Sequence, residues 1–142
     1  MRIGELARLA QCSVETVRYY EAEGLLPAAG RSAGNYREYG PGHFDRLRFI
    51  RNCRALDMSH EEIRTLLALA NGKAESCKAV NSVFDLHIAH VDERIRELSL
   101  LREQLTELRQ RCESEQSVKT CGILKGLSDM QTQVGHERHT HL

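Results

Sequence analysis

Apolar residues near the N-terminus recur at helical spacing in two short blocks. Residues 3–10 place their apolar side chains on one face of a helix, and residues 14–22 do so again after the polar break at Gln11–Ser13. Ser13 is a favourable N-cap for the second helix, and Gly24 is a favourable residue to end it. Two short helices joined by a tight turn predict a helix-turn-helix unit.

The next stretch, residues 25–40, replaces helical spacing with short extended segments around turn residues. The segments on either side of Gly34–Asn35 predict the two strands of a β-wing. Apolar spacing then predicts a helix over 43–56, and the capping box Ser59–Glu62 opens another over 60–70. We therefore expect a winged helix-turn-helix domain.

The longest periodic segment, residues 80–111, carries a narrow apolar stripe between charged faces. The stripe alternates four- and three-residue spacing and is interrupted only by Arg102 and Arg109, which Leu101 and Leu108 flank. Its members are Phe84, Ile88, Val91, Ile95, Leu98, Leu105 and Cys112. Such a stripe is typical of a coiled-coil seam.

A helix over 80–111 would be about 48 Å long at 1.5 Å per residue. A domain of this size has no room to bury it, so we expect the same helix of a second chain to cover the stripe, in an antiparallel or parallel homodimer. Packing against the chain's own N-terminal domain is the alternative.

The pattern as a whole predicts a mainly α fold. Its expected parts are a winged helix-turn-helix DNA-binding domain over 1–70, a linker loop over 71–79, a dimerisation helix over 80–111, a metal-binding loop and short helix over 112–128, and a flexible histidine-containing tail over 129–142.

Composition changes this picture in three ways. The low aromatic content, 5% with no Trp, argues against a β-sandwich or barrel. Twenty Lys and Arg balance twenty Asp and Glu, which argues against a nucleic-acid partner, yet residues 31–54 hold six arginines and only two acids. No apolar run is long enough to span a membrane and the N-terminus lacks a signal-peptide core, so we expect a cytoplasmic protein with reduced cysteines.

The helix-turn-helix and the wing carry side chains suited to DNA. A recognition helix over 14–22 would lie in the major groove, and Arg, Asn and Tyr are side chains that contact phosphates and sugars. A small helix pair with exposed polar residues and no DNA partner is the alternative. The candidate DNA-binding residues are Thr16, Arg18, Tyr19, Tyr20, Arg31, Asn35, Tyr36, Arg37 and Tyr39.

Three of the five cysteines are candidate metal ligands. Cys112 and Cys121 flank an eight-residue loop after the long helix, and Cys77 precedes that helix. All three meet only when two such helices pair antiparallel. Three thiolates form a soft site, suited to Cd(II), Pb(II) or Hg(II) rather than to Mg(II) or Ca(II). Cys12 and Cys53, inside helical segments, are expected to be ordinary packing residues, which is also the alternative for the other three.

Histidines suggest a second, weaker metal site. His87 and His90 are three residues apart on the long helix, so their rings share a face. The candidate residues are His87, His90, His136, His139 and His141. Solvated histidines without a metal are the alternative. No nucleophile–base pair, Walker loop or dinucleotide fingerprint is present, so we do not expect an enzyme.

Several motifs resemble the DNA-binding domain of the MerR family of transcriptional regulators. They are Ile3-Gly4-Glu5-Leu6-Ala7, Val17-Arg18-Tyr19-Tyr20-Glu21, Gly24-Leu25-Leu26-Pro27, Arg31 and Asn35-Tyr36-Arg37-Glu38-Tyr39. Within the family, three stretches are similar to the cadmium- and lead-responsive branch. These are 49–58, 87–90 and 121–124.

The resemblance implies an activator that binds a palindromic promoter element as a homodimer. Metal binding would bend and underwind the DNA so that RNA polymerase engages two promoter boxes that are otherwise too far apart, which is indirect readout used as a switch. Cd(II) or Pb(II) is the favoured metal, and Hg(II) or Zn(II) is the alternative within the family. A cytosolic thiol-based metal buffer or a redox sensor is the alternative from another class.

Overall fold

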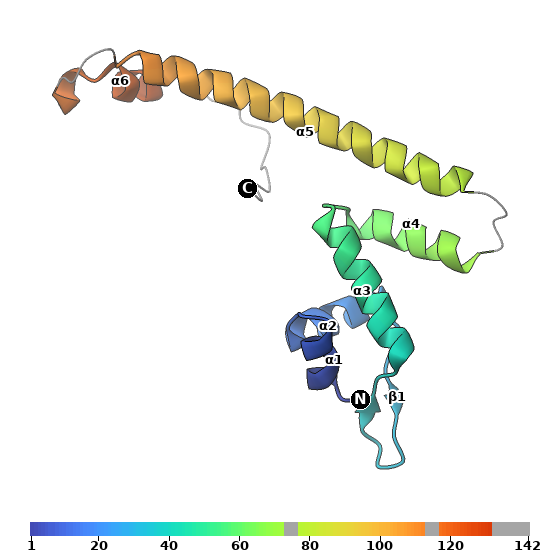
Figure 1. Ribbon diagram of the computed structural model, residues 1–142. Coiled ribbons are helices and arrows are strands. Elements are labelled where there is room, and N and C mark those ends of the chain that lie inside the picture. Colours follow the sequence, from blue (N-terminus) through green and yellow to red (C-terminus); the bar gives the residue numbers. More distant parts are fainter. Residues whose placement is uncertain (73–76, 113–116, 132–142) are drawn as a thin grey trace. The chain divides into compact units, whose positions relative to one another are not determined.

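The structure is a computed structural model that describes residues 1–72, 77–112 and 117–131 (Figure 1). Its elements are α1 (Ile3–Leu9), α2 (Val14–Ala22), β1 (Gly30–Arg31), β2 (Arg37–Glu38), α3 (Pro41–Ala55), α4 (His60–Asn71), α5 (Lys78–Gln110), the 3₁₀ helix η1 (Val118–Thr120) and α6 (Gly122–Asp129). The predicted mainly α fold is confirmed, with a helix-turn-helix, a small wing, one long helix and a short C-terminal helix.

Local capping fixes where the short helices begin. The Ser13 hydroxyl accepts a hydrogen bond from the Thr16 amide at 3.1 Å, which satisfies a free donor in the first turn of α2. Ser59 and Glu62 form the predicted capping box at the start of α4. Gly24, just after α2, has a φ of +75°, a conformation in which a side chain would be strained.

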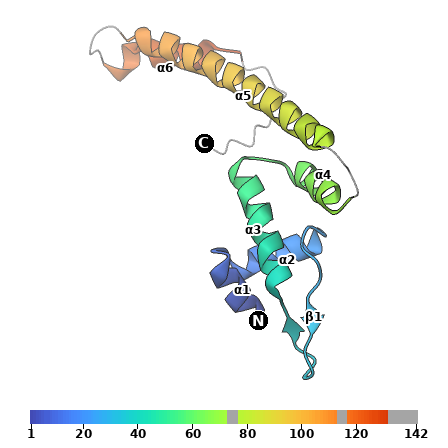
Figure 2. The ribbon, with the colours of Figure 1, turned by 45° about the vertical axis from the view of Figure 1, so that its right-hand side comes forward.

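The wing is a two-stranded antiparallel hairpin. Gly30 pairs with Glu38 and Arg31 pairs with Arg37. Asn35 turns the chain with a φ of +63°, which asparagine tolerates better than most residues. Figure 2 shows this hairpin extending away from the helices of the N-terminal unit. At its base, the Met1 ammonium donates to the Tyr39 carbonyl oxygen at 2.7 Å, which ties the N-terminus to the wing.

One hydrophobic core holds the four short helices together. Leu6 of α1, Val17 of α2, Leu47 and Ile50 of α3 and Ile63 of α4 belong to it, and each is fully buried. Complete burial of such side chains stabilises the fold by roughly 1.5–3 kcal/mol each. This core sets the position of α2 relative to the base of the wing, since Val17, Tyr20 and Tyr39 all belong to it.

The chain forms two compact units, Met1–Ile88 and a second one that begins at Ala89. The first unit includes the first turns of α5, where Val80 and Val83 pack against the hydrophobic core. Among the described residues, no helix is both long and apolar enough to cross a membrane.

Candidate metal centre and nucleic-acid interface

Helix α2 presents part of its surface outside the core. The Thr16 hydroxyl lies 2.8 Å from the Ser13 hydroxyl, which holds Thr16 in the first turn. Arg18 and Tyr19 are exposed. The Tyr19 hydroxyl lies 3.4 Å from Nδ1 of His60, at the start of α4. These three residues of α2 are therefore available to a ligand outside the protein.

The wing presents a second polar surface. Arg31, Asn35, Tyr36 and Arg37 are all exposed, as a nucleic-acid contact requires. The Arg31 guanidinium donates to the Asn35 carbonyl oxygen at 3.4 Å, which links the strand to the turn. The Arg2 guanidinium lies 4.2 Å from the centre of the Tyr36 ring, a cation–π distance.

Two of the tyrosines expected to contact DNA lie in the hydrophobic core instead. Tyr20 is 8% exposed and Tyr39 is 1% exposed. Burial, together with the neighbouring Glu21 carboxylate, raises the pKa of Tyr39 to about 12. Both rings belong to the hydrophobic core of the N-terminal unit, so they expose little surface to a ligand outside the protein. The sequence pattern alone did not show that these two side chains are buried.

The arginine-rich stretch 31–54 divides into two groups. In the helix that follows the wing, Arg46 donates to the Leu25 carbonyl oxygen at 3.3 Å and Arg54 to that of Met58 at 2.6 Å. Arg51 donates to the carbonyl oxygens of residues 10 and 11. These arginines brace the backbone of the domain. The local charge excess in the sequence therefore overstates how many arginines are free to bind phosphate. The exposed ones are Arg31 and Arg37 of the wing and Arg48 of α3.

The structure brings Cys112 and Cys121 together. Cys112 follows the last turn of α5, and Cys121 is the N-cap residue of α6. The backbone amides of Leu124 and Ile123 lower the pKa of Cys121, and a hydrogen bond from the Cys112 thiol lowers it further. Two half-buried sulfurs with one pKa depressed can bind a soft cation as thiolates. Sequence spacing did not reveal the contribution of the helix N-terminus.

Cys77 is exposed and lies immediately before α5, whereas Cys112 lies just beyond its other end. The 33 residues of α5 give a helix about 50 Å long. No residue of α5 is buried. The stripe residues Phe84, Ile88, Val91, Ile95 and Leu105 each expose 40% or more of their surface. This surface is apolar and lacks a covering element within the described chain.

His87 has two neighbours from the N-terminal unit. Its Nδ1 lies 3.1 Å from a Glu62 carboxylate oxygen, and its Nε2 lies 2.8 Å from the Leu56 carbonyl oxygen. His90 follows one turn later on the same helix, where the ring nitrogens of the two histidines come within 4.8 Å. The sequence pattern predicted a capping role for Glu62 but not its position beside His87. His136, His139 and His141 lie outside the described residues.

The two remaining cysteines belong to the N-terminal domain. Cys53 is buried in the core, and burial raises its pKa. Cys12 is half-buried, and burial raises its pKa as well, although the nearby Arg51 opposes that shift. Both surroundings favour the neutral thiol, which agrees with a packing role.

Comparison with known proteins gives consistent matches along the chain. Residues 1–70 match the family described as MerR HTH family regulatory protein, and residues 44–108 match the family described as MerR, DNA binding. The HTH-type transcriptional regulator ZntR homolog of Haemophilus influenzae is 49% identical over 111 residues, which cover 78% of this chain and 82% of the relative.

Solved structures agree with the sequence relatives. The transcription regulator PbrR691 from Ralstonia metallidurans CH34, in complex with lead(II), is 50% identical with a TM-score of 0.80, and the match covers 89% of this chain and 98% of that one. The dual function regulator MerR from Bacillus megaterium MB1, in complex with a mercury(II) ion, is 27% identical with a TM-score of 0.72, and the match covers 90% and 99%.

Identities of 49% and 50% over most of both chains establish the family. Its members named here are transcriptional regulators, and the expectation that the protein is not an enzyme is confirmed. The chain belongs to the MerR family of helix-turn-helix transcriptional regulators.

Proposed function

We propose that the protein is a homodimeric transcriptional activator that responds to a soft divalent metal ion, with Cd(II) or Pb(II) favoured. The observation that carries the proposal is the contact between the Cys112 and Cys121 thiols at the start of α6. A pair of adjacent thiols with one pKa lowered is suited to a thiophilic cation and poorly suited to Mg(II) or Ca(II).

The third ligand in this proposal is Cys77 of a second chain. Within one chain the length of α5 separates Cys77 from Cys112, so a shared site requires two α5 helices in antiparallel pairing. The exposed apolar stripe along α5 supports that pairing, because such a surface is costly to leave in water. The metal would then join the two subunits.

The choice of metal rests on chemistry and on the relatives. Three thiolates suit Cd(II), Pb(II) and Hg(II), and a tetrahedral Zn(II) site would add a fourth ligand. The solved structure at 50% sequence identity is in complex with lead(II), and the one in complex with mercury(II) is 27% identical. Because the ZntR homolog is 49% identical, Zn(II) is the alternative inducing metal in this proposal.

The proposed DNA interface combines the recognition helix and the wing. It comprises Thr16, Arg18, Tyr19, Arg31, Asn35, Tyr36 and Arg37, and it omits the buried Tyr20 and Tyr39. Two such units in a dimer would contact two halves of a palindromic promoter. Since the thiol site would join the subunits, metal binding would shift one DNA-binding unit against the other and distort the DNA between them, so that RNA polymerase responds to DNA shape.

A second, weaker metal site on α5 is also part of this proposal. His87 and His90 share a face, and the Glu62 carboxylate stands beside His87, which adds an acidic group to the imidazoles. Imidazole and carboxylate together suit Zn(II) or Cd(II). The histidines of residues 132–142 are candidates to complete it.

The test is metal titration of the purified apo protein under anaerobic conditions, combined with transcription in vitro. Thiolate-to-metal charge-transfer absorption should grow with Cd(II) or Pb(II), and transcription should rise over the same range. Cys112→Ser should abolish both while leaving affinity for DNA unchanged, and the control Cys12→Ser should keep both. Induction that survives in Cys112→Ser would refute the ligand assignment. Induction by peroxide without metal would favour a redox sensor.

A further inference from the structure

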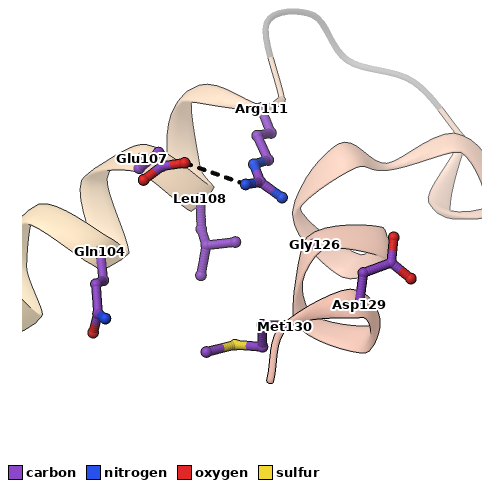
Figure 3. A pocket seen from close by; sticks show the side chains of 7 residues that line it. All are labelled: Gln104, Glu107, Leu108, Arg111, Gly126, Asp129 and Met130. Carbon is purple, nitrogen blue, oxygen red and sulfur yellow. Dashed lines mark hydrogen bonds and ion pairs between the residues drawn. The ribbon is translucent and has the colours of Figure 1, made fainter. Parts of the chain in front are cut away.

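We propose that Arg111 is a positioning residue that holds Cys112 beside Cys121 through a close fit between the end of α5 and the glycines of α6. The inference rests on the proposed function, because it concerns the same thiol pair. Figure 3 shows the arrangement, with Arg111 directed toward the helix that carries Gly126.

The backbone contact lies next to both sulfurs. Arg111 directly precedes Cys112, and Gly122 directly follows Cys121. A Cβ on Gly122 would lie 2.6 Å from the Arg111 carbonyl oxygen, which is closer than any side chain can approach. The two ligand residues are therefore fixed by their immediate neighbours, although eight residues of sequence separate them. Without that contact, the effective concentration of one sulfur near the other would be lower, because closing the loop between them costs conformational entropy.

One turn further along α6, Gly126 lies close to the side chain of Arg111. Gly126 is buried, and a Cβ there would lie 2.5 Å from Nη1 of Arg111 and 2.8 Å from Cδ2 of Leu108. The guanidinium is held from the other side, since it donates to a Glu107 carboxylate oxygen at 3.2 Å (Figure 3). Arg111 is therefore confined between its own helix and α6.

The surroundings of Arg111 suit positioning rather than ligand binding. With Gly126 and Met130 it lines a shallow pocket of about 270 Å³ between α5 and α6. Glu107 and Asp129 also line the pocket, and the Glu107 carboxylate is the one that accepts a hydrogen bond from the guanidinium (Figure 3). A cationic guanidinium cannot itself bind a metal ion, so its effect on metal binding must act through the placement of Cys112.

The two glycines make different predictions. Alanine at position 122 meets a backbone carbonyl, which no rotamer change can relieve. Alanine at position 126 meets the ends of two flexible side chains, which can rotate away. Alanine also favours helix over glycine by about 1 kcal/mol in a helix interior, so Gly126→Ala does not weaken α6 itself. We therefore expect Gly122→Ala to disturb the placement of the two thiols more than Gly126→Ala does.

The first measurement follows sulfur placement without metal. The full-length apo protein is equilibrated with glutathione disulfide, and mass mapping quantifies the Cys112–Cys121 disulfide, whose formation reduces one glutathione disulfide to two glutathione thiols. Gly122→Ala should lower this equilibrium constant by at least about tenfold and Gly126→Ala by a smaller factor. The control Ser128→Ala, exposed on the same helix, should match wild type.

The second measurement is Cd(II) affinity, by competition with a chelator, together with the charge-transfer band. Gly122→Ala should lose at least about tenfold in affinity and weaken the band, with the helical circular dichroism signal preserved. Arg111→Ala should also lower the affinity, but by less than Gly122→Ala, because it removes the side chain packed against Gly126 and leaves the backbone contact at Gly122 in place.

The outcomes separate the two ideas. Wild-type Cd(II) affinity for Arg111→Ala, or wild-type values for Gly122→Ala and Gly126→Ala in both measurements, would overturn the positioning role while leaving the metal site intact. Failure of every variant and of wild type to bind Cd(II), with the disulfide equilibrium still lowered in Gly122→Ala, would support the positioning role and refute the proposed thiolate metal site.

Discussion

Glu62 shows how one side chain can serve two helices. One carboxylate oxygen accepts a hydrogen bond from the Ser59 amide at 3.0 Å, and the other lies 3.1 Å from Nδ1 of His87. The same imidazole lies 2.8 Å from the Leu56 carbonyl oxygen through Nε2. His87 therefore joins the start of α5 to the corner between α3 and α4. The position of α5 at this corner depends on single polar contacts as well as on apolar packing.

Cys121 should be more reactive than the buried Cys53 at mildly alkaline pH. The amides of Leu124 and Ile123 lower its pKa, whereas burial raises the pKa of Cys53. A lower pKa gives more thiolate at a given pH, and the thiolate is the nucleophile. Alkylation by iodoacetamide, followed by peptide mapping across a pH series, should give a lower midpoint pH of alkylation for Cys121 than for Cys53.

Removing the Cys112 thiol provides the control for this prediction. Cys112→Ala should raise the Cys121 midpoint only in part, because the two amides that dominate the shift remain in place. Equal midpoints for Cys121 and Cys53 in the wild-type protein would contradict the assignment of Cys121 to the N-terminus of α6.

Capping and turn chemistry set the limits of the elements. The sequence predicted a helix over 43–56, and α3 runs over Pro41–Ala55. It begins earlier because proline is well suited to the first helical position, where its missing amide hydrogen is not needed. The helices expected over 14–22 and 60–70 occur as Val14–Ala22 and His60–Asn71, since each has a serine cap that sequence alone identifies.

Loss of the α4 cap should destabilise the N-terminal domain. Ser59→Ala removes the acceptor of the Glu62 amide, a hydrogen bond of 3.1 Å. The expected loss is about 1 kcal/mol in the free energy of unfolding, measured by urea denaturation at fixed protein concentration. Ser128→Ala, on the exposed side of α6, serves as the comparison and should change the value by less than about 0.5 kcal/mol. An equal loss of stability in both variants would show that the Ser59 cap does not stabilise the domain.

The wing arginines should account for part of the salt dependence of DNA binding. Arg31→Ala and Arg37→Ala should each weaken binding to a duplex of random sequence and reduce the slope of log affinity against log salt by about one. Arg96→Ala, on an exposed turn of α5, is the charge-matched comparison and should leave the slope unchanged. Unchanged slopes in the wing variants would place the phosphate contacts elsewhere.

At the scale of the whole molecule, α5 presents a structural difficulty for a single chain. It is a helix of 33 residues without a buried side chain, and its apolar stripe is exposed. Such a helix gains most of its stability from packing an apolar face against another element. In the proposed antiparallel dimer, a second copy of the chain would supply the same face in reverse order, and opposite ends of two α5 helices would lie side by side.

A charge in the stripe should separate the subunits. Ile95→Asp places a carboxylate in the proposed seam, and sedimentation equilibrium should show a shift toward monomer by at least about tenfold in the dissociation constant. Leu100→Asp is the matched control, because Leu100 is more exposed than Ile95 and lies outside the stripe. A dimer that tolerates Ile95→Asp as well as Leu100→Asp would place the interface on another face.

The sequence by itself determined the order and type of the elements, the apolar stripe of α5 and the identity of the thiols, because each depends on local spacing and capping. Tertiary structure decided which way side chains point. Tyr20 and Tyr39 are buried in the core, Arg46 and Arg51 donate to distant backbone carbonyls, and Glu62 lies beside His87. Tertiary structure also brought Arg111 and Gly122 into contact across the loop that separates Cys112 from Cys121. These outcomes depend on contacts between residues distant in the chain, which local spacing does not encode.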